Sequence, residues 1–218
     1  WQISCFYNHQ MNFLEKYGIK IILILFLTIS YSITAETKKL LILGDSISAG
    51  YGLKESENWV QLLETSLNAS NVELKIINSS ISGDTTVGGL SRIESDLRKY
   101  NPNYVLIELG GNDALRGYPI DRIKTNLLKI IDASLAAEAN PIIMQIRIPP
   151  NYGKNYVAAF ESIYSEIALE KNIPKMSFIL EKVALDKSLM QQDGIHPNSK
   201  AQPLIAKQVE IEIKKIIQ

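Results

Sequence analysis

The chain has 218 residues, 46% of them hydrophobic, and its 23 lysines and arginines balance its 23 aspartates and glutamates. These values suit one globular domain with a sizeable core, and the neutral balance gives no electrostatic reason to expect a nucleic acid as partner. With Cys5 as its single cysteine, the chain can form neither an intramolecular disulfide nor a cysteine cluster around a metal ion.

The first 35 residues have the composition of a targeting segment. Met11 is a candidate start, and it is followed by a lysine-bearing stretch, an apolar run over residues 19–29 and an end of small residues, as in a secretory signal peptide. The run is shorter than the about 20 residues that a membrane-spanning helix needs, although an uncleaved anchor is the alternative. We expect cleavage after Ala35, a single domain over residues 37–218, and a periplasmic or secreted monomer without stable membrane insertion.

Beyond this segment, short apolar runs alternate with amphipathic stretches. In chain order we expect a strand at 40–43, a helix at 59–67, a strand at 72–77, a helix at 87–100, a strand at 104–109, a helix at 120–139, a strand at 142–148, a helix at 156–170, a weak strand at 176–179 and a helix at 201–217. This alternation predicts an α/β domain with a parallel sheet and helices on both faces. In such sheets ligands bind at the carboxyl ends of the strands.

Residues that could take part in catalysis follow the first three predicted strands. Ser46, in the tripeptide at 44–46, can present its hydroxyl on a tight turn as a nucleophile. Gly83 lets the backbone approach a ligand closely, and Asn112 can donate its side-chain N–H to an oxyanion. Taken singly, each of the three is more often an ordinary turn residue.

Near the C-terminus, Asp193 and His196 lie three residues apart, just before Pro197. His196 is the only histidine after residue 35, and Asp193 can accept its Nδ1 proton and leave Nε2 free as a base. A surface turn and a metal-ligand pair are the alternatives; the processed chain would offer a metal no second histidine and no cysteine, so only a carboxylate-rich site would remain. Together with the strand ends, this pair completes the set of groups that acyl transfer requires.

The sequence blocks at 41–46, 82–86, 108–113 and 193–198 resemble those of the SGNH, or GDSL-type, hydrolases, with Ile47 where that family has leucine. The blocks at 144–149 and 151–153 extend the resemblance to bacterial periplasmic members that act as thioesterases, lysophospholipases and arylesterases. The fold that the resemblance implies is a flavodoxin-like, three-layer α/β/α sandwich with a five-stranded parallel sheet.

The resemblance also implies the roles of the site residues. Ser46, Asp193 and His196 would form a catalytic triad, and the oxyanion hole would consist of the N–H groups of Ser46 and Gly83 and the side chain of Asn112. The implied activity is hydrolysis of small-molecule acyl esters or thioesters through an acyl-enzyme on Ser46, without a cofactor or a metal ion.

The acyl pocket and the substrate are less constrained by the sequence. Residues just after strand ends can line an apolar groove or simply pack as loops, namely Leu115, Tyr118, Pro149, Pro150 and Tyr152. A carbohydrate O-acetylesterase would use the same catalytic residues on a shorter acyl group. A flavodoxin-like binding module without catalysis would share the fold, since a fold does not imply a function, and a metal phosphoesterase is a further alternative.

Overall fold

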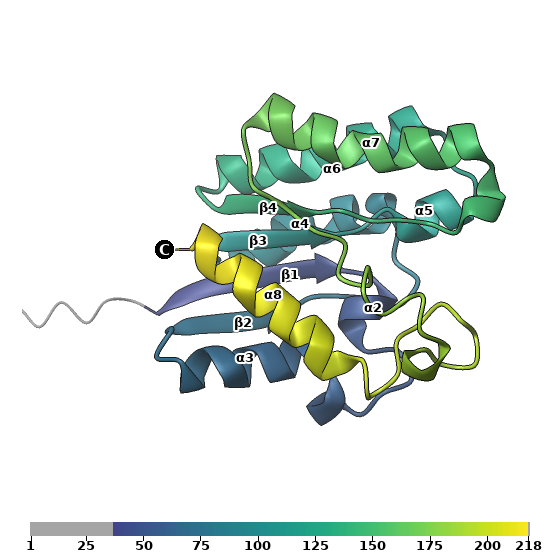
Figure 1. Ribbon diagram of the computed structural model, residues 1–218. Coiled ribbons are helices and arrows are strands. Elements are labelled where there is room, and N and C mark those ends of the chain that lie inside the picture. Colours follow the sequence, from purple (N-terminus) through teal and green to yellow (C-terminus); the bar gives the residue numbers. More distant parts are fainter. Residues whose placement is uncertain (1–36, 218) are drawn as a thin grey trace, which may run out of the picture. The chain divides into compact units, whose positions relative to one another are not determined.

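The computed structural model, shown in Figure 1, describes residues 37–217. The predicted signal peptide, with its candidate start at Met11 and its cleavage site after Ala35, lies outside the described residues. Within 37–217, no helix combines the length and the apolar character needed to cross a bilayer.

Five parallel strands form one sheet. In spatial order they are β2 (Leu74–Asn78), β1 (Lys38–Gly44), β3 (Tyr104–Glu108), β4 (Asn140–Met144) and β5 (Lys175–Met176). The chain leaves β1 toward one edge to form β2 and returns past β1 to form β3, so the strand order reverses between β1 and β3. The loops that follow these two neighbouring strands therefore diverge, which opens a crevice at the carboxyl ends of the strands.

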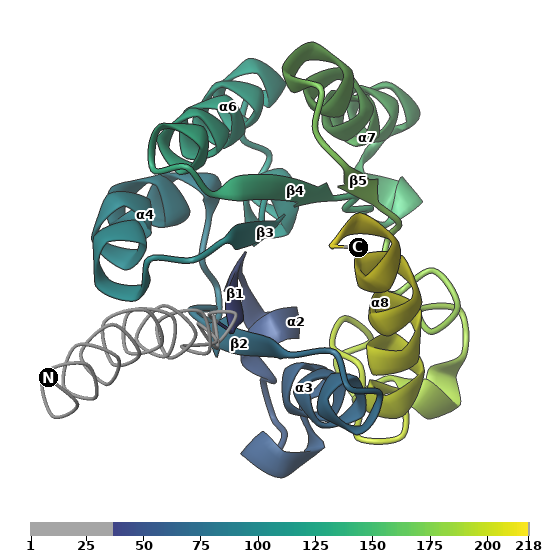
Figure 2. The same cartoon turned by 90° about the vertical axis from the view of Figure 1, so that its left-hand side faces the viewer.

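Helices cover both faces of this sheet, as Figure 2 shows. One face carries α4 (Thr86–Tyr100), α6 (Ile120–Ala136) and α7 (Lys154–Lys171), and the other carries α3 (Trp59–Ala69) and α8 (Gln202–Ile216). Leu41 and Leu43 of β1 pack on the first side, whereas Leu40 and Ile42 pack on the second, and all four are fully buried. A strand covered on both faces reads as a continuous apolar run, which is why this one was visible in the sequence. The predicted three-layer α/β/α fold is confirmed.

Several one-turn elements are too short to leave a helical period in the sequence. They are α2 (Ser46–Ala49), α5 (Gly111–Leu115) and three 3-10 turns, η1 (Glu55–Glu57), η2 (Pro150–Tyr152) and η3 (Lys187–Leu189). The helices α2 and α5 begin directly after β1 and near the end of β3. Ser46 and Asn112 consequently lie in first helical turns at the crevice.

The last two strands are shorter than predicted. The sequence predicts strands at 142–148 and 176–179, but β4 ends at Met144 and β5 has two residues. The N–H of Gln145 donates to the carbonyl of Met176 at 2.9 Å, and β5 offers no residue for pairing beyond that bond. Ile146 and Ile148 are still buried, but against the helical layer of α4, α6 and α7, so their alternation mimics a strand.

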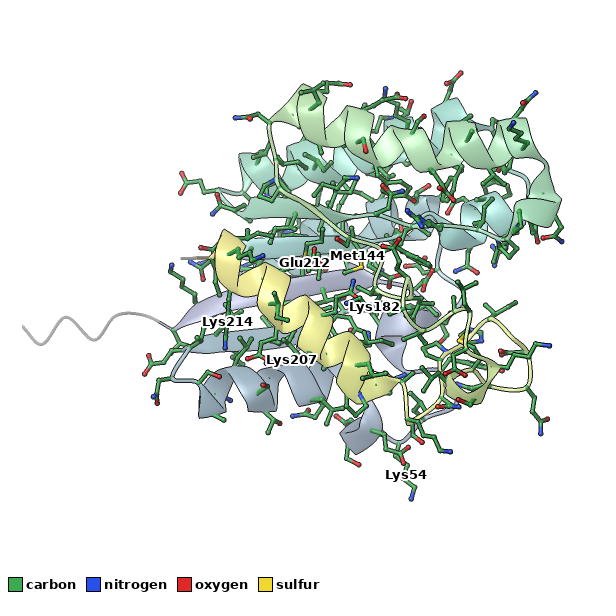
Figure 3. All side chains as sticks on the ribbon, in the orientation of Figure 1. Lys54, Met144, Lys182, Lys207, Glu212 and Lys214 are labelled. Atoms are coloured by element: carbon green, nitrogen blue, oxygen red, sulfur yellow. The ribbon has the colours of Figure 1, made fainter. Side chains whose placement is uncertain are left out.

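One buried carboxylate on α8, that of Glu210, forms ion pairs with two lysines. Glu210 is 3% exposed and accepts bonds from Lys207 at 3.1 Å and Lys214 at 2.6 Å. Figure 3 shows both lysines on this helix. The hydrogen bond from Lys214 is the main cause that lowers the pKa of Glu210 to about 2.

Candidate active site

Ser46 stands at the first position of α2, immediately after the buried strand β1. The side chain of Asp45 caps this helix, because its Oδ1 accepts a hydrogen bond from the Ile47 N–H at 3.0 Å. Gly50 ends the helix with φ 76°, a left-handed conformation that glycine adopts without strain. The tight turn directs the Ser46 hydroxyl into the crevice at the sheet edge.

A line of short hydrogen bonds joins Ser46 to the C-terminal Asp–His pair. His196 Nε2 lies 2.8 Å from Ser46 Oγ, and His196 Nδ1 lies 2.6 Å from Asp193 Oδ2. The other oxygen of Asp193 accepts from the backbone N–H groups of Ile195 and His196. Burial alone would raise the pKa of Asp193, but these bonds from His196 and Ile195 lower it to about 2. An ionised Asp193 favours the imidazole tautomer with its proton on Nδ1, which leaves a lone pair on Nε2 facing Ser46.

The loop over residues 192–198 carries His196 and is called the histidine loop here. Two residues that the sequence did not indicate, Gln191 and Tyr51, hold it in place. The Gln191 N–H donates to the His196 carbonyl at 2.8 Å, and the Gln191 amide donates to the carbonyls of Tyr51 and Pro197. The Tyr51 ring lies 4.5 Å from the imidazole, centre to centre. These contacts join the loop after α2 to the loop before α8. No local sequence pattern predicts this pairing.

Asn112 extends from α5 toward the same crevice. Its Nδ2 donates to the Asp84 carbonyl at 2.9 Å and to Asp45 Oδ2 at 3.1 Å. Gly83 precedes Asp84 in the turn after β2, has φ 78°, and its carbonyl accepts from Arg116 Nη2 at 3.1 Å. The turn that contains Gly83 is thus tied to α5 by bonds from both Asn112 and Arg116.

The crevice continues into a largely apolar groove of about 460 Å³. Ser46, Asn112 and His196 line one end of it. The walls consist mainly of residues 146–150 and of apolar side chains from the irregular segment 178–190, namely Phe178, Ile179, Leu180, Ala184, Leu185 and Met190. The sequence did not place any of these six side chains in a groove, because it predicts a weak strand at 176–179 and the rest of the segment has no regular period.

The predicted pocket residues divide into two groups. Leu115, Pro149 and Pro150 line the groove. Tyr118 and Tyr152 are not among the lining residues: Tyr118 packs against the helical layer of α4, α6 and α7, and Tyr152 is 38% exposed in η2. Gly83 does not line the groove either, although the adjacent Asp84 carbonyl contacts Asn112.

Two buried carboxyl groups lie beneath Ser46. Asp45 and Glu108 are 5% and 2% exposed, and they come together because β1 and β3 pair with Gly44 opposite Glu108. Burial is the main cause that raises the pKa of Asp45 to about 6 and raises that of Glu108 well above its ordinary value. Across residues 37–217, no three His, Cys, Asp or Glu side chains are grouped in a way that could hold a metal ion.

Comparison with known proteins finds related sequences and structures over most of the chain. The model of the GDSL-like lipase/acylhydrolase family matches residues 42–203. The chain is 42% identical to thioesterase 1/protease 1/lysophospholipase L1 of Escherichia coli K12, over 88% of this chain and 91% of that protein. It is 45% identical to an arylesterase of Vibrio mimicus, over 88% and 96%. A crystal structure of a psychrotrophic esterase from Pseudoalteromonas superposes with a TM-score of 0.80 at 45% identity, over 82% of this chain and 97% of the esterase.

Proposed function

Because the chain belongs to the GDSL-like lipase/acylhydrolase family and is a hydrolase of carboxylic esters and thioesters, we propose that Ser46 is its nucleophile. His196 acts as the base and Asp193 orients it. The observation that carries the proposal is the hydrogen-bonded line from Ser46 Oγ through the imidazole to the Asp193 carboxylate, with contacts of 2.8 and 2.6 Å.

The proton moves along this line during the reaction. His196 Nε2 takes the proton of the Ser46 hydroxyl as Oγ attacks the acyl carbonyl, and the resulting imidazolium is stabilised by the ionised Asp193. The imidazolium then protonates the departing alcohol or thiol, which leaves an acyl group on Ser46. Water, deprotonated by the same histidine, attacks this acyl-enzyme and releases the carboxylic acid.

The negative charge on the carbonyl oxygen needs preorganised donors, and we assign these to Ser46, Gly83 and Asn112. Within residues 37–217, neither the Ser46 N–H nor the Gly83 N–H has a hydrogen-bond acceptor, so both are free to bind an oxyanion. Asn112 lines the same groove as Ser46. Each such donor is worth about 3 kcal/mol of barrier in enzymes of this type.

The groove beside Ser46 supports the substrate class that we propose. Its volume of about 460 Å³ and its apolar walls favour an acyl chain over the single methyl group of an acetyl ester, which argues against a carbohydrate O-acetylesterase. The activities in the names of the relatives are thioesterase, protease, lysophospholipase and arylesterase. We propose acyl thioesters, lysophospholipids and aryl esters as the substrates to test.

We further propose that residues 11–35 are a signal peptide and that the processed enzyme works as a monomer in the periplasm or outside the cell. The apolar run at 19–29 and the change to small residues before Ala35 support export. N-terminal sequencing of the exported form should begin after Ala35, and recovery of Met11 at the mature terminus would contradict the proposal.

The catalytic proposal is tested with Ser46→Ala and a fluorophosphonate probe. The variant should fold as the wild type does, lose turnover on acyl thioesters, lysophospholipids and aryl esters, and no longer react with the probe. Ser162→Ala is the matched control, because Ser162 is exposed on α7 and bonds only within its helix. Probe labelling that persists in Ser46→Ala would identify a different nucleophile, and a wild-type protein that neither reacts nor turns over would favour the binding-module alternative.

A further inference from the structure

The buried carboxyl pair beneath the nucleophile has no role in the proton transfers described above. Asp45 and Glu108 come from the ends of β1 and β3, the two strands between which the sheet reverses its order. Both contact the groove that Ser46 and Asn112 line. A catalytic contribution from this pair rests on the proposed roles of Ser46 and Asn112.

The side-chain amide of Asn112 connects this pair to the proposed oxyanion hole. The amide nitrogen of Asn112 has two hydrogens, and the resting structure gives it two acceptors, the Asp84 carbonyl and Asp45 Oδ2. The Asp84 carbonyl belongs to the backbone, whereas Asp45 offers a side-chain carboxyl whose charge can change. An oxyanion that binds Asn112 must therefore share or take the hydrogen that Asp45 holds.

Asp45 and Glu108 also constrain each other. Glu108 Oε2 accepts from the Asp45 backbone N–H at 3.2 Å and from the Ser48 hydroxyl at 2.7 Å, and a Cβ on Gly44 would lie 2.7 Å from the same oxygen. Because residue 44 is a glycine, the Glu108 carboxyl can lie against the backbone of the turn that carries Ser46.

The surroundings oppose a double negative charge on this pair. Within residues 37–217, neither carboxyl has an ion pair with a lysine or an arginine. The titratable groups around them are His196 from the C-terminal loop, Asp84 from the turn after β2, Asp113 from α5 and Tyr164 from α7. Of these only His196 can carry a positive charge, and burial raises the pKa of both Asp45 and Glu108.

We propose that Asp45 and Glu108 form a positioning pair that retains one proton and aims the Asn112 amide at the developing oxyanion. The ionised Asp45 fixes the amide through Oδ2 and the α2 N-terminus through Oδ1. Glu108, as the neutral acid, fills the space below without adding a second negative charge beside the oxyanion. Neither residue touches the substrate carbonyl; both act through Asn112 and the turn that carries Ser46.

Three variants test this arrangement, with active sites counted by fluorophosphonate titration so that unfolded protein does not enter kcat. In Asp45→Asn one amide oxygen must serve both the Ile47 N–H and Asn112, so kcat should fall about 10-fold or more while KM changes by less than about 2-fold. Glu108→Gln keeps the shape and hydrogen-bonding groups of the neutral acid and should keep kcat within about 3-fold of the wild type. Glu108→Ala should lower kcat about 10-fold, so that glutamine rescues what alanine loses.

The control is Glu210→Gln, which alters a buried carboxylate on α8 that bonds with two lysines away from the groove. It should lower the midpoint of thermal unfolding and leave kcat unchanged. Wild-type kcat in Asp45→Asn, or a Glu108→Gln enzyme as slow as Glu108→Ala, would overturn the proposal. If Asp45→Asn does not fold, the comparison of the two Glu108 variants decides. A Ser46→Ala variant that retains turnover would instead refute the proposed function itself.

Discussion

The hydrogen bonds of Asp193 lead to a sharp expectation for Asp193→Asn. The asparagine oxygen can still accept from the backbone N–H groups of Ile195 and His196, so the loop should keep its shape. Its amide nitrogen, however, faces His196 Nδ1 at the 2.6 Å contact and can only donate there. The imidazole proton must then move to Nε2, which removes the lone pair that faces Ser46 at 2.8 Å.

The size of the effect depends on the interactions that each atom loses. Restoring the active tautomer would set two donors against each other at Nδ1 and forfeit a charge-assisted bond worth about 1.5–3 kcal/mol. The imidazolium formed in the transition state also loses its carboxylate partner. For a serine–histidine–aspartate arrangement this change typically lowers kcat about 10⁴-fold, or about 5 kcal/mol.

The assay is kcat on an aryl ester, normalised to folded protein by thermal unfolding and circular dichroism. Asp193→Ala is the informative companion, because alanine removes the charge without imposing the inactive tautomer. It should be slower than the wild type and faster than Asp193→Asn. An Asp193→Asn enzyme within about 10-fold of the wild type, or one that is faster than Asp193→Ala, would refute the tautomer argument.

Two further outcomes are expected. Because the pKa of Glu108 is raised in the folded state, the folded protein holds a proton that the unfolded chain releases, so wild-type stability relative to Glu108→Gln should decline as the pH rises from about 4.5 toward the folded pKa. Urea unfolding at several pH values measures this difference, and parallel curves would contradict it. Tyr164→Phe should cost about 1–2 kcal/mol of unfolding free energy in the same assay, because the Tyr164 hydroxyl is the 2.9 Å donor to the buried Leu109 carbonyl; an unchanged value would mean that this bond contributes nothing net.

The fold and the core of the site were accessible from sequence for a common reason. Ser46 and Asn112 each lie within a few residues of the end of an apolar run, and in a parallel sheet the ends of such runs meet at one edge. The Asp193–His196 spacing then completes the set, because the pair needs only its own turn to form. Local patterns of this kind can be recognised in the sequence without knowledge of the tertiary contacts.

The remainder depends on contacts between distant segments. The wall at 178–190 has no regular period, so its path over the groove is decided by what it packs against. The pairing of Asp45 with Glu108 needs the register that sets Gly44 opposite Glu108, and register is not readable from either strand alone. Tyr118 illustrates the converse: its place in the loop between α5 and α6 does not say on which side of the sheet its ring packs.

The bond between His196 and Ser46 also has a consequence for how the enzyme comes to be active. It joins residues 150 positions apart, and Gln202 at the start of α8 fastens the histidine loop by accepting from the Trp59 N–H of α3 and donating to the Asn198 carbonyl. A nascent chain that ends after α5 therefore carries Ser46 and the proposed oxyanion donors but lacks His196, the proposed base. Because turnover needs this long-range contact, recovered turnover should report that the C-terminal segment has packed against the rest of the domain.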